Sequence, residues 1–425
     1  MGGVGKTTLA RYAHDDPLTL HHFDVRAWVT VSQGNSARGV LLSILHSINA
    51  TKTGLDDVYL VRSVYQYLKG RRYVIVIDDI WSTNVWDELR AVFPNDFNGS
   101  RIVITTRLLE VASYVDSSSR PYEVHLMDVD RSWCLLKEKV FGRRENCPSE
   151  LEHIGRLIAE NCRGLPLAVV VIAGVLSKAD RRQESWANIA RNVKTVVKNS
   201  ASDDRFSEIL SLSYAYLPHY LRPCFLYMGC FPEDHEINVS KLVKLWAAEG
   251  FLRPNGSDDL EELAEGCLEE LVKRSLILVT RKKYDGRIKR VKIHDLLRDL
   301  CISKARDEKF LCVINEFPLS SSQGIIDQSS RRLSILANIL GGFRNTNGSP
   351  IHTILLFKHT AVDSWRSFRL LRVVDAFNII MASYPDQIFE LFHLRYLAFT
   401  FETDHKKVLE YDFLNLFLNS RIFKP

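Results

Sequence analysis

The segment GGVGKTT at residues 2–8 constrains this chain of 425 residues more than any other feature. Its glycines let backbone N–H groups fold around phosphate oxygens, its lysine neutralises β- and γ-phosphate charge, and a threonine hydroxyl can ligate Mg²⁺. A helical pattern follows at once, and a helix that starts here adds the positive end of its dipole. The alternative is a chance glycine-rich turn. We therefore predict a phosphate-binding loop in which nucleotide contacts come from Gly3, Gly5, Lys6, Thr7 and Thr8, with Thr7 also on the metal.

Strand-like and helix-like apolar patterns alternate over the residues that follow. Short, almost entirely apolar runs predict strands, and longer amphipathic runs predict helices between them. Strands of this kind, separated by helices, are typical of a parallel sheet covered on both faces. We predict an α/β phosphate-loop NTPase domain over residues 1–145, with ligands at the carboxyl ends of its strands. The predicted strands are 25–31, 73–77 and 101–106, and the clearest predicted helices are 39–48 and 58–68.

Polar residues stand where two of these strands end. Asp78 and Asp79 follow the run YVIVI, and Arg107 follows the next strand along the chain. In a phosphate-loop NTPase the first aspartate holds Mg²⁺ and a second acid can orient the attacking water, so Asp79 is the predicted catalytic residue. Arg107 could reach the γ-phosphate. The alternatives are a solvated strand end for the two acids and a surface arginine that caps a strand.

Helical patterns fill residues 151–217, interrupted by Pro166 inside an apolar segment. A proline within such a pattern starts or breaks a helix. We predict a helical lid domain over residues 146–220. From the residues alone, Pro166 is as well explained by a helix start as by a contact with a ligand.

Residues 221–315 combine helical patterns with a hairpin and predict a winged-helix domain. Strand-like runs at 276–280 and 288–293 flank Asp285-Gly286, a hairpin turn signal. Residues 281–292 hold seven basic side chains and one acidic one. A winged-helix DNA-binding regulator is therefore an alternative function. The helices before the hairpin offer no basic face for a groove, however, so a solvated hairpin is favoured and sequence-specific DNA binding is disfavoured.

Residues 316–425 predict a serine-rich linker, 319–332, followed by the first leucine-rich repeats. The patterns Leu371-Arg372-Val373-Val374 and Leu394-Arg395-Tyr396-Leu397 are one repeat length apart. Repeats of this kind need several neighbours and a terminal cap to be stable. The chain stops at Pro425 without a visible cap, so we expect the solenoid to be truncated.

The overall composition predicts a protein of a reducing compartment that does not span a membrane. The eight cysteines form no CxxC pair, which is typical of reduced, buried thiols. The longest apolar stretch, 165–176, is too short to cross a bilayer, and the first residues lack the apolar core of a secretory signal. A net charge of +5 is too small to indicate a surface that is basic overall and binds nucleic acid. These features predict a soluble, cytoplasmic protein without a transmembrane segment.

Seven segments follow one another along the chain and are considered together. They are GGVGKTT at 2–8, FDVRAWVTVSQ at 23–33, YVIVIDDIW at 73–81, GSRIVITTR at 99–107, CRGLPLA at 162–168, CFLYMGCFPED at 224–234 and VKIHDLLRDL at 291–300. In this order they closely resemble the nucleotide-binding core of plant intracellular immune receptors with leucine-rich repeats. Trp81 resembles the subfamily whose N-terminal domain is a coiled coil, and SWANIARNV and RIKRVKIHDLLRDLC resemble the late-blight-resistance group.

The resemblance implies an ADP/ATP-binding switch that acts in the defence response to pathogens. ADP would hold a closed state, and exchange for ATP would permit opening and self-oligomerisation, with at most slow ATP hydrolysis as a reset. The family also implies that Pro166 lines the adenine pocket and that His294 reaches the β-phosphate. Ile293 stands where the family usually has Met. The repeats would bind a pathogen effector or a guarded host protein.

Alternatives remain for the motif at residues 293–295 and for the whole chain. A lone histidine before an apolar helix is normally a cap or a core residue, and Asp295 is expected to cap the helix that starts at Leu296. The first glycine of the family's phosphate loop, and the strand before it, would precede Met1. We therefore expect truncation at both ends, and an inactive fragment of a receptor is one alternative. Another is an NTPase that works by steady turnover.

Overall fold

The computed structural model describes most of the chain in two compact units. The first unit comprises Met1–Ser132 with Arg163–Val169, and the second comprises Trp133–Cys162 with Val170–Pro425. Residues 316–329, which hold most of the predicted linker, lie outside the described residues, and the predicted boundaries near 145, 220 and 315 stay predictions. The described residues are 2–31, 37–48, 56–116, 120–199, 205–252, 259–315, 330–343, 350–358, 360–362, 365, 368–381, 390–401 and 408–412.

A parallel sheet forms the centre of the first unit, as predicted. Its strand order is β1-β2-β3, with Val25 opposite Tyr73 and Val74 opposite Arg101. All six residues of β2 are buried, which explains why that strand is almost entirely apolar. The elements are α1 (Lys6–Asp15), α2 (Pro17–His22), β1 (Val25–Thr30), α3 (Ala37–Ser47), α4 (Asp57–Leu68), β2 (Tyr73–Asp78), α5 (Thr83–Arg90), β3 (Arg101–Ile104) and α6 (Leu109–Val115).

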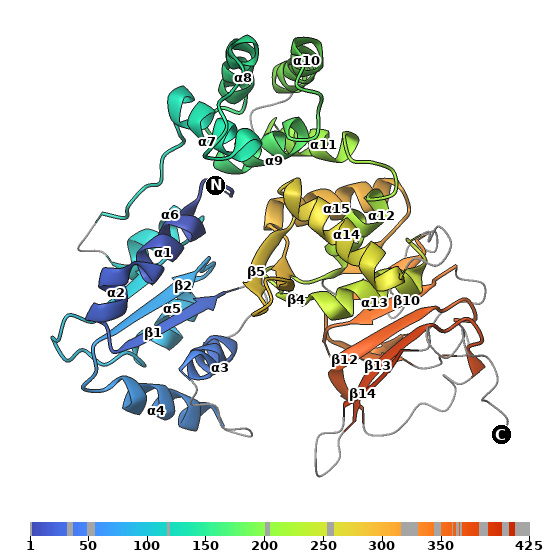
Figure 1. Ribbon diagram of the computed structural model, residues 1–425. Helices are drawn as coiled ribbons and strands as arrows, with labels where there is room; N and C mark the ends of the chain where they lie inside the picture. The colour runs from blue at the N-terminus through green and yellow to red at the C-terminus, as the bar shows by residue number, and fades with distance from the viewer. Residues whose placement is uncertain are drawn as a thin grey trace. The chain divides into compact units, whose positions relative to one another are not determined.

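Alternation along the strands divides the core between the two faces of the sheet. Val29 and Ile75 belong to one apolar cluster with the inward side chains of α3, α4 and α5. Val74 and Val76 point to the opposite face and are also buried, and α1 contacts β2. Figure 1 shows α1 on one side of β1 and β2, with α3 and α4 on the other. The phosphate loop therefore leads into a helix that is packed on the central strand.

The segment 163–169 is distant in sequence but belongs to the first unit. The Met127 N–H donates to the Gly164 carbonyl at 2.9 Å, and the Leu167 N–H donates to the Gly3 carbonyl at 3.3 Å. Gly164 has φ +72°, and a Cβ added there would lie 2.1 Å from the Met127 carbonyl oxygen. Glycine is therefore required at position 164 for two reasons, its backbone conformation and the close approach of another backbone.

Replacing Gly164 by alanine is expected to destabilise the first unit by about 1–3 kcal/mol more than a matched change. The matched change is Gly70→Ala, because Gly70 lies in the same unit and has φ +75° but nothing within 4 Å of an added Cβ. Both variants introduce a strained backbone, and only the first also introduces the clash with Met127. Thermal unfolding of both variants measures the difference, and equal losses would show that the approach to Met127 is not rigid.

Helices fill the lid region, and the predicted helical pattern is confirmed over its described residues. Pro166 is the first residue of its helix, where its missing N–H costs nothing. None of the helices among the described residues is both long and apolar enough to span a membrane. The helices are α7 (Val129–Phe141), α8 (Ser149–Asn161), α9 (Pro166–Leu176), α10 (Gln183–Asn199) and α11 (Arg205–Ala215).

The predicted hairpin is present in a three-stranded antiparallel sheet of order β4-β6-β5. Gly286, with φ 84°, lies in its turn. β5 begins two residues after the predicted start, and the buried residues 276 and 277 precede its ladder. The elements are α12 (Arg222–Tyr227), the 3₁₀ turn η1 (Met228–Cys230), β4 (Ile237–Asn238), α13 (Val239–Glu249), α14 (Leu260–Lys273), β5 (Leu278–Lys282), β6 (Ile288–Lys292) and α15 (Asp295–Asp307).

A second sheet, parallel except for its edge strand β14, follows the hairpin in the order β14-β13-β12-β10-β8-β7. The two predicted repeat segments lead into adjacent strands in which Val373 lies opposite Tyr396. Leu371 and Leu394 precede these strands and pack in one apolar cluster. The strands are β7 (Cys312–Ile314), β8 (Arg332–Ile335), β10 (Thr353–Leu356), β12 (Val373–Met381), β13 (Tyr396–Phe401) and the antiparallel β14 (Val408–Asp412), with β9 (Ile339–Phe343) and β11 (Thr360–Val362) in a separate ladder.

Candidate functional site: the carboxyl edge of the first sheet

The two predicted metal ligands, Thr7 and Asp78, meet at the end of β2. The Thr7 hydroxyl donates to Asp78 Oδ1 at 3.0 Å, and the Thr105 hydroxyl donates to the same oxygen at 2.6 Å. Asp78 is only 1% exposed. Hydroxyl and carboxylate oxygens are ligands that Mg²⁺ accepts, usually beside waters and phosphate oxygens. The donor set therefore fits a magnesium ion, although the assignment to Mg²⁺ stays a prediction.

Asp79 and Arg107 form a two-pronged ion pair beside Asp78. Arg107 Nε donates to Asp79 Oδ1 at 3.2 Å, and Nη2 donates to Oδ2 at 2.9 Å. The guanidinium also lies 4.8 Å from the ring centre of Trp81. The Asp79 backbone adopts φ 59°, and its N–H donates to the Thr105 hydroxyl at 2.9 Å. Such strain in a non-glycine residue persists only where its surroundings hold it, and it often marks functional sites.

The phosphate loop itself has the backbone of an anion site. Gly5 is the N-cap of α1 with φ 97°, a value that L side chains rarely adopt. A Cβ at Gly5 would meet nothing within 4 Å, so the requirement for glycine is conformational. The first turn of α1 contains no acidic residue. Its N–H groups and the positive end of the helix dipole are therefore not offset by a side-chain carboxylate in that turn.

Burial is the main influence on Lys6, which is half-buried. Desolvation lowers the pKa of its ammonium group, and the positive charge of Arg107 adds to this effect. Asp79 and Asp78 act in the opposite direction and raise the pKa. A phosphate group next to Lys6 would add negative charge and would favour the charged ammonium. The electrostatics of this lysine therefore suit an anionic ligand.

Pro166 and the phosphate loop are neighbours within the first unit, because the N–H of Leu167 donates to the Gly3 carbonyl.

Two residues that were not among the predicted site residues, Thr105 and Trp81, also contribute to the site. The buried Thr105 hydroxyl donates to the Asp78 carboxylate and accepts from the Asp79 N–H. Its position directly after a strand was the feature of the sequence that could have indicated this role. Trp81 supplies the surface under Arg107, and no pattern in the sequence indicated that pairing.

His294 lies in the second unit and caps a helix. It is the N-cap of α15, and its Nδ1 accepts from the Leu296 N–H at 3.2 Å. The helix begins at Asp295, so the expectation that Asp295 is the capping residue is wrong. A histidine that accepts at Nδ1 carries its proton on Nε2, when neutral, and can donate from there. The predicted contact between His294 and a phosphate stays a prediction.

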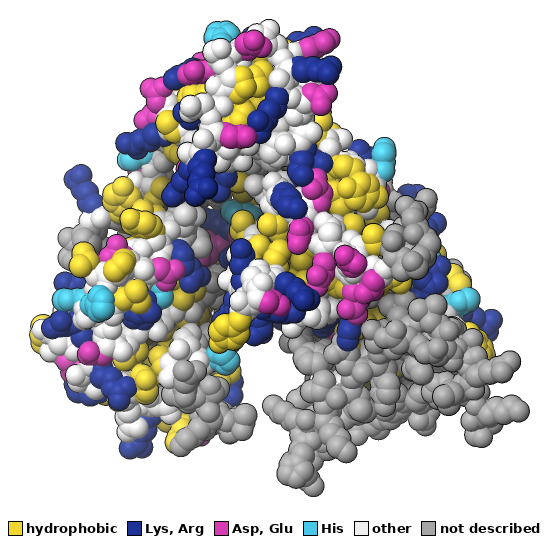
Figure 2. Space-filling model, viewed as in Figure 1, with side chains coloured by type: hydrophobic (Ala, Val, Ile, Leu, Met, Phe, Trp, Pro, Cys, Tyr) yellow, Lys and Arg dark blue, Asp and Glu magenta, His cyan; other side chains and the backbone are white. Residues whose placement is uncertain are grey.

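Acidic partners offset much of the basic charge on the hairpin. Arg290 and Arg281 lie 3.4 and 3.8 Å from Glu236, and Lys292 lies 3.2 Å from Asp234. Arg287 pairs within the turn with its neighbour Asp285 at 3.3 Å. Figure 2 shows basic and acidic side chains intermingled over the region of β5. This pattern favours a solvated hairpin over a surface built for DNA phosphates.

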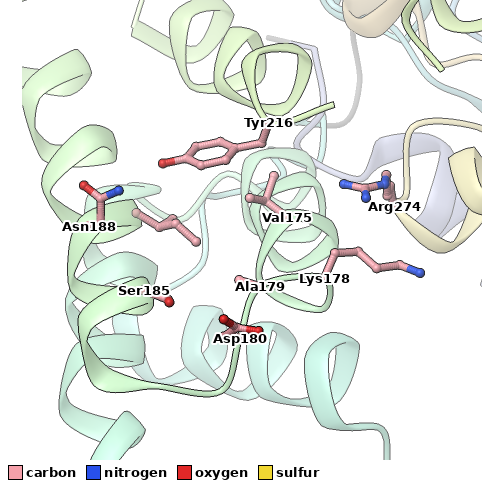
Figure 3. A pocket seen from close by; sticks show the side chains of 9 residues that line it. Val175, Lys178, Ala179, Asp180, Ser185, Asn188, Tyr216 and Arg274 are labelled. Carbon is pink, nitrogen blue, oxygen red and sulfur yellow. The ribbon is translucent and has the colours of Figure 1, made fainter. Parts of the chain in front are cut away.

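A cavity of about 280 Å³ lies in the second unit, among the helices of the lid and the end of α14. Figure 3 shows the Tyr216 ring extending over it toward Asn188, with Arg274 and Lys178 on the other side. Both cations pair with Glu270, at 2.7 Å from Lys178 and 3.0 Å from Arg274. The Tyr216 hydroxyl accepts from Asn192. Lys178, Arg274 and the Tyr216 hydroxyl are thus each paired with a protein group, and we assign this cavity no ligand.

Two domain families match parts of the chain. Residues 1–146 match the NB-ARC domain family, and residues 230–301 match the Disease resistance protein Winged helix domain family. Among solved structures, a signal transduction ATPase with a tetratricopeptide repeat sensor from Pyrococcus horikoshii is similar, with 15% identity and a TM-score of 0.42, over 73% of this chain and 40% of that one.

Curated relatives come from Solanum demissum. Putative late blight resistance protein homolog R1B-14 is 35% identical over 424 residues, which cover 95% of this chain and 31% of the relative. Late blight resistance protein R1-A is 40% identical over 319 residues, which cover 74% of this chain and 24% of the relative. The chain thus spans less than a third of the length of these two relatives. Residues 1–146 are therefore an NB-ARC domain and residues 230–301 a disease-resistance winged-helix domain, in a chain that is similar over most of its length to late blight resistance proteins and their homologues.

Proposed function

We propose that this chain is the ADP/ATP-operated switch of a plant disease resistance protein. The observation that carries the proposal is the convergence of Thr7 and Thr105 on one oxygen of Asp78, at the end of a phosphate loop. A nucleotide would select between conformations by its different contacts in each, so binding energy would drive the switch. ADP would favour the closed state, and ATP the open one.

Each predicted contact has a specific chemical role in this proposal. Backbone N–H groups of the loop would bind phosphate oxygens, and Lys6 would neutralise their charge. Mg²⁺, held by Thr7 and Asp78, would neutralise further phosphate charge. Pro166 would lie against the adenine, since its segment is bonded to Gly3. The nucleotide-binding set is Gly3, Gly5, Lys6, Thr7, Thr8, Arg107, Pro166 and His294.

The ion pair between Asp79 and Arg107 would keep hydrolysis slow. While Arg107 holds both carboxylate oxygens, Asp79 has little capacity to orient a water molecule. A γ-phosphate would compete for the guanidinium, because phosphate oxygens accept from arginine as strongly as a carboxylate does. Release of Asp79 would then permit a slow reset by hydrolysis.

The second unit would contact the bound nucleotide and would also bind the protein that signals the pathogen. His294 would donate from Nε2 to the β-phosphate of ADP and so tie the winged helix to the bound nucleotide. The parallel strands from β8 to β13 would begin a leucine-rich-repeat solenoid, with an effector or a guarded host protein as its ligand. We also place the protein in the cytoplasm, where opening would allow self-association.

The purified chain provides the test of this function. We expect ADP to co-purify with it, added ADP to raise its melting temperature, and turnover to stay far below the roughly 1–10³ s⁻¹ of ordinary enzymes. Mass analysis of the extracted nucleotide, calorimetry and a phosphate-release assay measure the three. Fast, steady hydrolysis would instead favour an NTPase that works by turnover, and absence of any nucleotide effect would count against the switch.

Replacing Arg107 by glutamine is expected to weaken ATP binding about tenfold, or about 1.4 kcal/mol, with a smaller effect on ADP. The reason is that only ATP carries the γ-phosphate that Arg107 is proposed to contact. Arg101→Gln, at the exposed start of β3, the strand that precedes Arg107, is the matched control. Titration with both nucleotides measures the selectivity, and an equal loss for ATP and ADP would remove Arg107 from the γ-phosphate contact.

A further inference from the structure

A row of basic side chains lies directly before the parallel strands of the second sheet. The strand registers place one basic residue at the same position before β8, β10, β12 and β13. Main-chain bonds of 2.7 Å continue across the row, from the His352 N–H to the Arg331 carbonyl, from Arg372 to His352 and from Arg395 to Arg372. We call these four residues the basic row. Neighbouring strands lie about 4.8 Å apart, so the row spans about 14 Å.

The charges of the basic row act on one another. Residues at one register position project toward the same side of a sheet, so these side chains start out as neighbours. Burial and the charge of Arg372, followed by the charges of Arg332 and Arg331, lower the pKa of His352 to about 4. Burial and the charge of Arg395 lower the pKa of Arg372. Like charges opposite each other on adjacent strands are destabilising, and an anion bound to the row would remove this effect.

Glu249 is an acid that acts on the row, but its carboxylate oxygens are bonded to other groups. Its charge raises the pKa of Arg372. Its Oε2 accepts from Arg332, and its Oε1 accepts from a threonine hydroxyl on β10. Among the described residues, no acid forms an ion pair with Arg331, Arg372 or Arg395. Three guanidinium groups of the row therefore have no bonded counter-charge in the part of the chain that the structure describes.

We propose that the basic row binds a compact anion that carries several phosphate groups. Each guanidinium presents a planar fork of donors that matches two phosphate oxygens. Phosphate groups supply several negative charges in a small volume, on which long arginine side chains from neighbouring strands can converge. An acidic peptide supplies one charge per side chain and loses conformational entropy when it is ordered, so it is disfavoured. The row shares no residue with the nucleotide-binding set.

Calorimetric titration of the full chain with sodium tripolyphosphate tests the proposal. Saturating ADP is present, so that the probe does not bind at the phosphate loop. We expect saturable binding at physiological ionic strength and a higher melting temperature with the probe. Arg372→Gln should weaken the binding at least about tenfold. Arg369→Gln is the matched control, because Arg369 is exposed shortly before the same strand, and this change should leave the affinity unaltered.

Two further measurements separate binding from folding. Without the probe, Arg372→Gln should melt at or above the temperature of the unaltered chain, because repulsion from Arg395 is removed. Arg331→Gln changes an exposed residue and should also weaken the binding, which decides the matter if Arg372→Gln does not fold. The proposal is overturned if the unaltered chain does not bind the probe, or if the variants of the row bind it as tightly as Arg369→Gln. These variants leave the phosphate loop intact, so the comparison holds whether or not ADP occupies that loop.

Two other probes identify the source of the phosphate groups. Vesicles of phosphatidylcholine with phosphatidylinositol bisphosphate are sedimented with the chain, and binding that Arg372→Gln removes would assign the row to a lipid headgroup. Binding of tripolyphosphate without binding of these vesicles would assign it to a free anion. A polyglutamate peptide should bind at least about tenfold more weakly than tripolyphosphate. Equal affinity for the peptide would overturn the assignment of the row to phosphate.

Discussion

Replacing Lys6 by arginine is expected to abolish the retention of ADP. Lys6 is half-buried, and desolvation already disfavours its charge, so the site accepts one compact ammonium group in a confined place. Arginine keeps the charge, but it is a larger, planar group with a fixed fork of donors. We expect affinity to fall by at least about 100-fold, or about 3 kcal/mol, which is at the upper end for a hydrogen bond to a charged group.

Equilibrium titration with ADP and mass analysis of the purified variant measure this effect. Lys69→Arg is the matched control, because Lys69 lies in the same unit, is 53% exposed in its side chain and pairs with Asp96 at the surface. Its nucleotide affinity should equal that of the unaltered chain. ADP that remains bound to the Lys6→Arg variant with unchanged affinity would contradict the assignment of Lys6 to the phosphates.

Replacing Glu249 by alanine is expected to destabilise the second unit by about 3–5 kcal/mol. Glu249 ends α13 with a fully buried side chain, and both Nε and Nη2 of Arg332 lie within 3.0 Å of its Oε2. Its Oε1 accepts from the Thr353 hydroxyl at 2.5 Å. The Arg332 guanidinium also lies 4.0 Å from the centre of the Phe310 ring and 4.9 Å from that of Phe251. Removal of Glu249 would leave a guanidinium that is buried and has lost its counter-charge.

Calorimetry of the full chain measures this loss, which should lower a melting transition by on the order of 10 °C. Glu269→Ala is the control, because Glu269 pairs with Lys273 on the exposed surface of α14, and such pairs contribute about 0–1 kcal/mol. Glu249→Leu combined with Arg332→Leu should recover much of the stability, since no charge is then buried unpaired. A small effect of Glu249→Ala would show that water or another group reaches Arg332.

The sequence by itself determined the local elements and the chemistry of the nucleotide site. The apolar run before Asp78 specified a buried parallel strand, and the three predicted strands differ from the observed ones by at most two residues at an end. Motif spacing also placed Thr7 and Asp78 together, because parallel strands bring their carboxyl ends to one edge. These features are readable because glycine conformation, strand burial and metal-ligand chemistry depend on residue type over short distances.

Contacts between distant residues were decided only by the tertiary structure. Nothing in the sequence indicated that Arg107 would bind Asp79 or that Glu249 would meet Arg332. The choice of His294 over Asp295 as the cap of α15 also depended on where the helix begins. Each of these contacts requires the relative placement of elements that are far apart along the chain. That placement comes from the packing of whole faces, which no single motif encodes, and it decides which charged side chains are buried together.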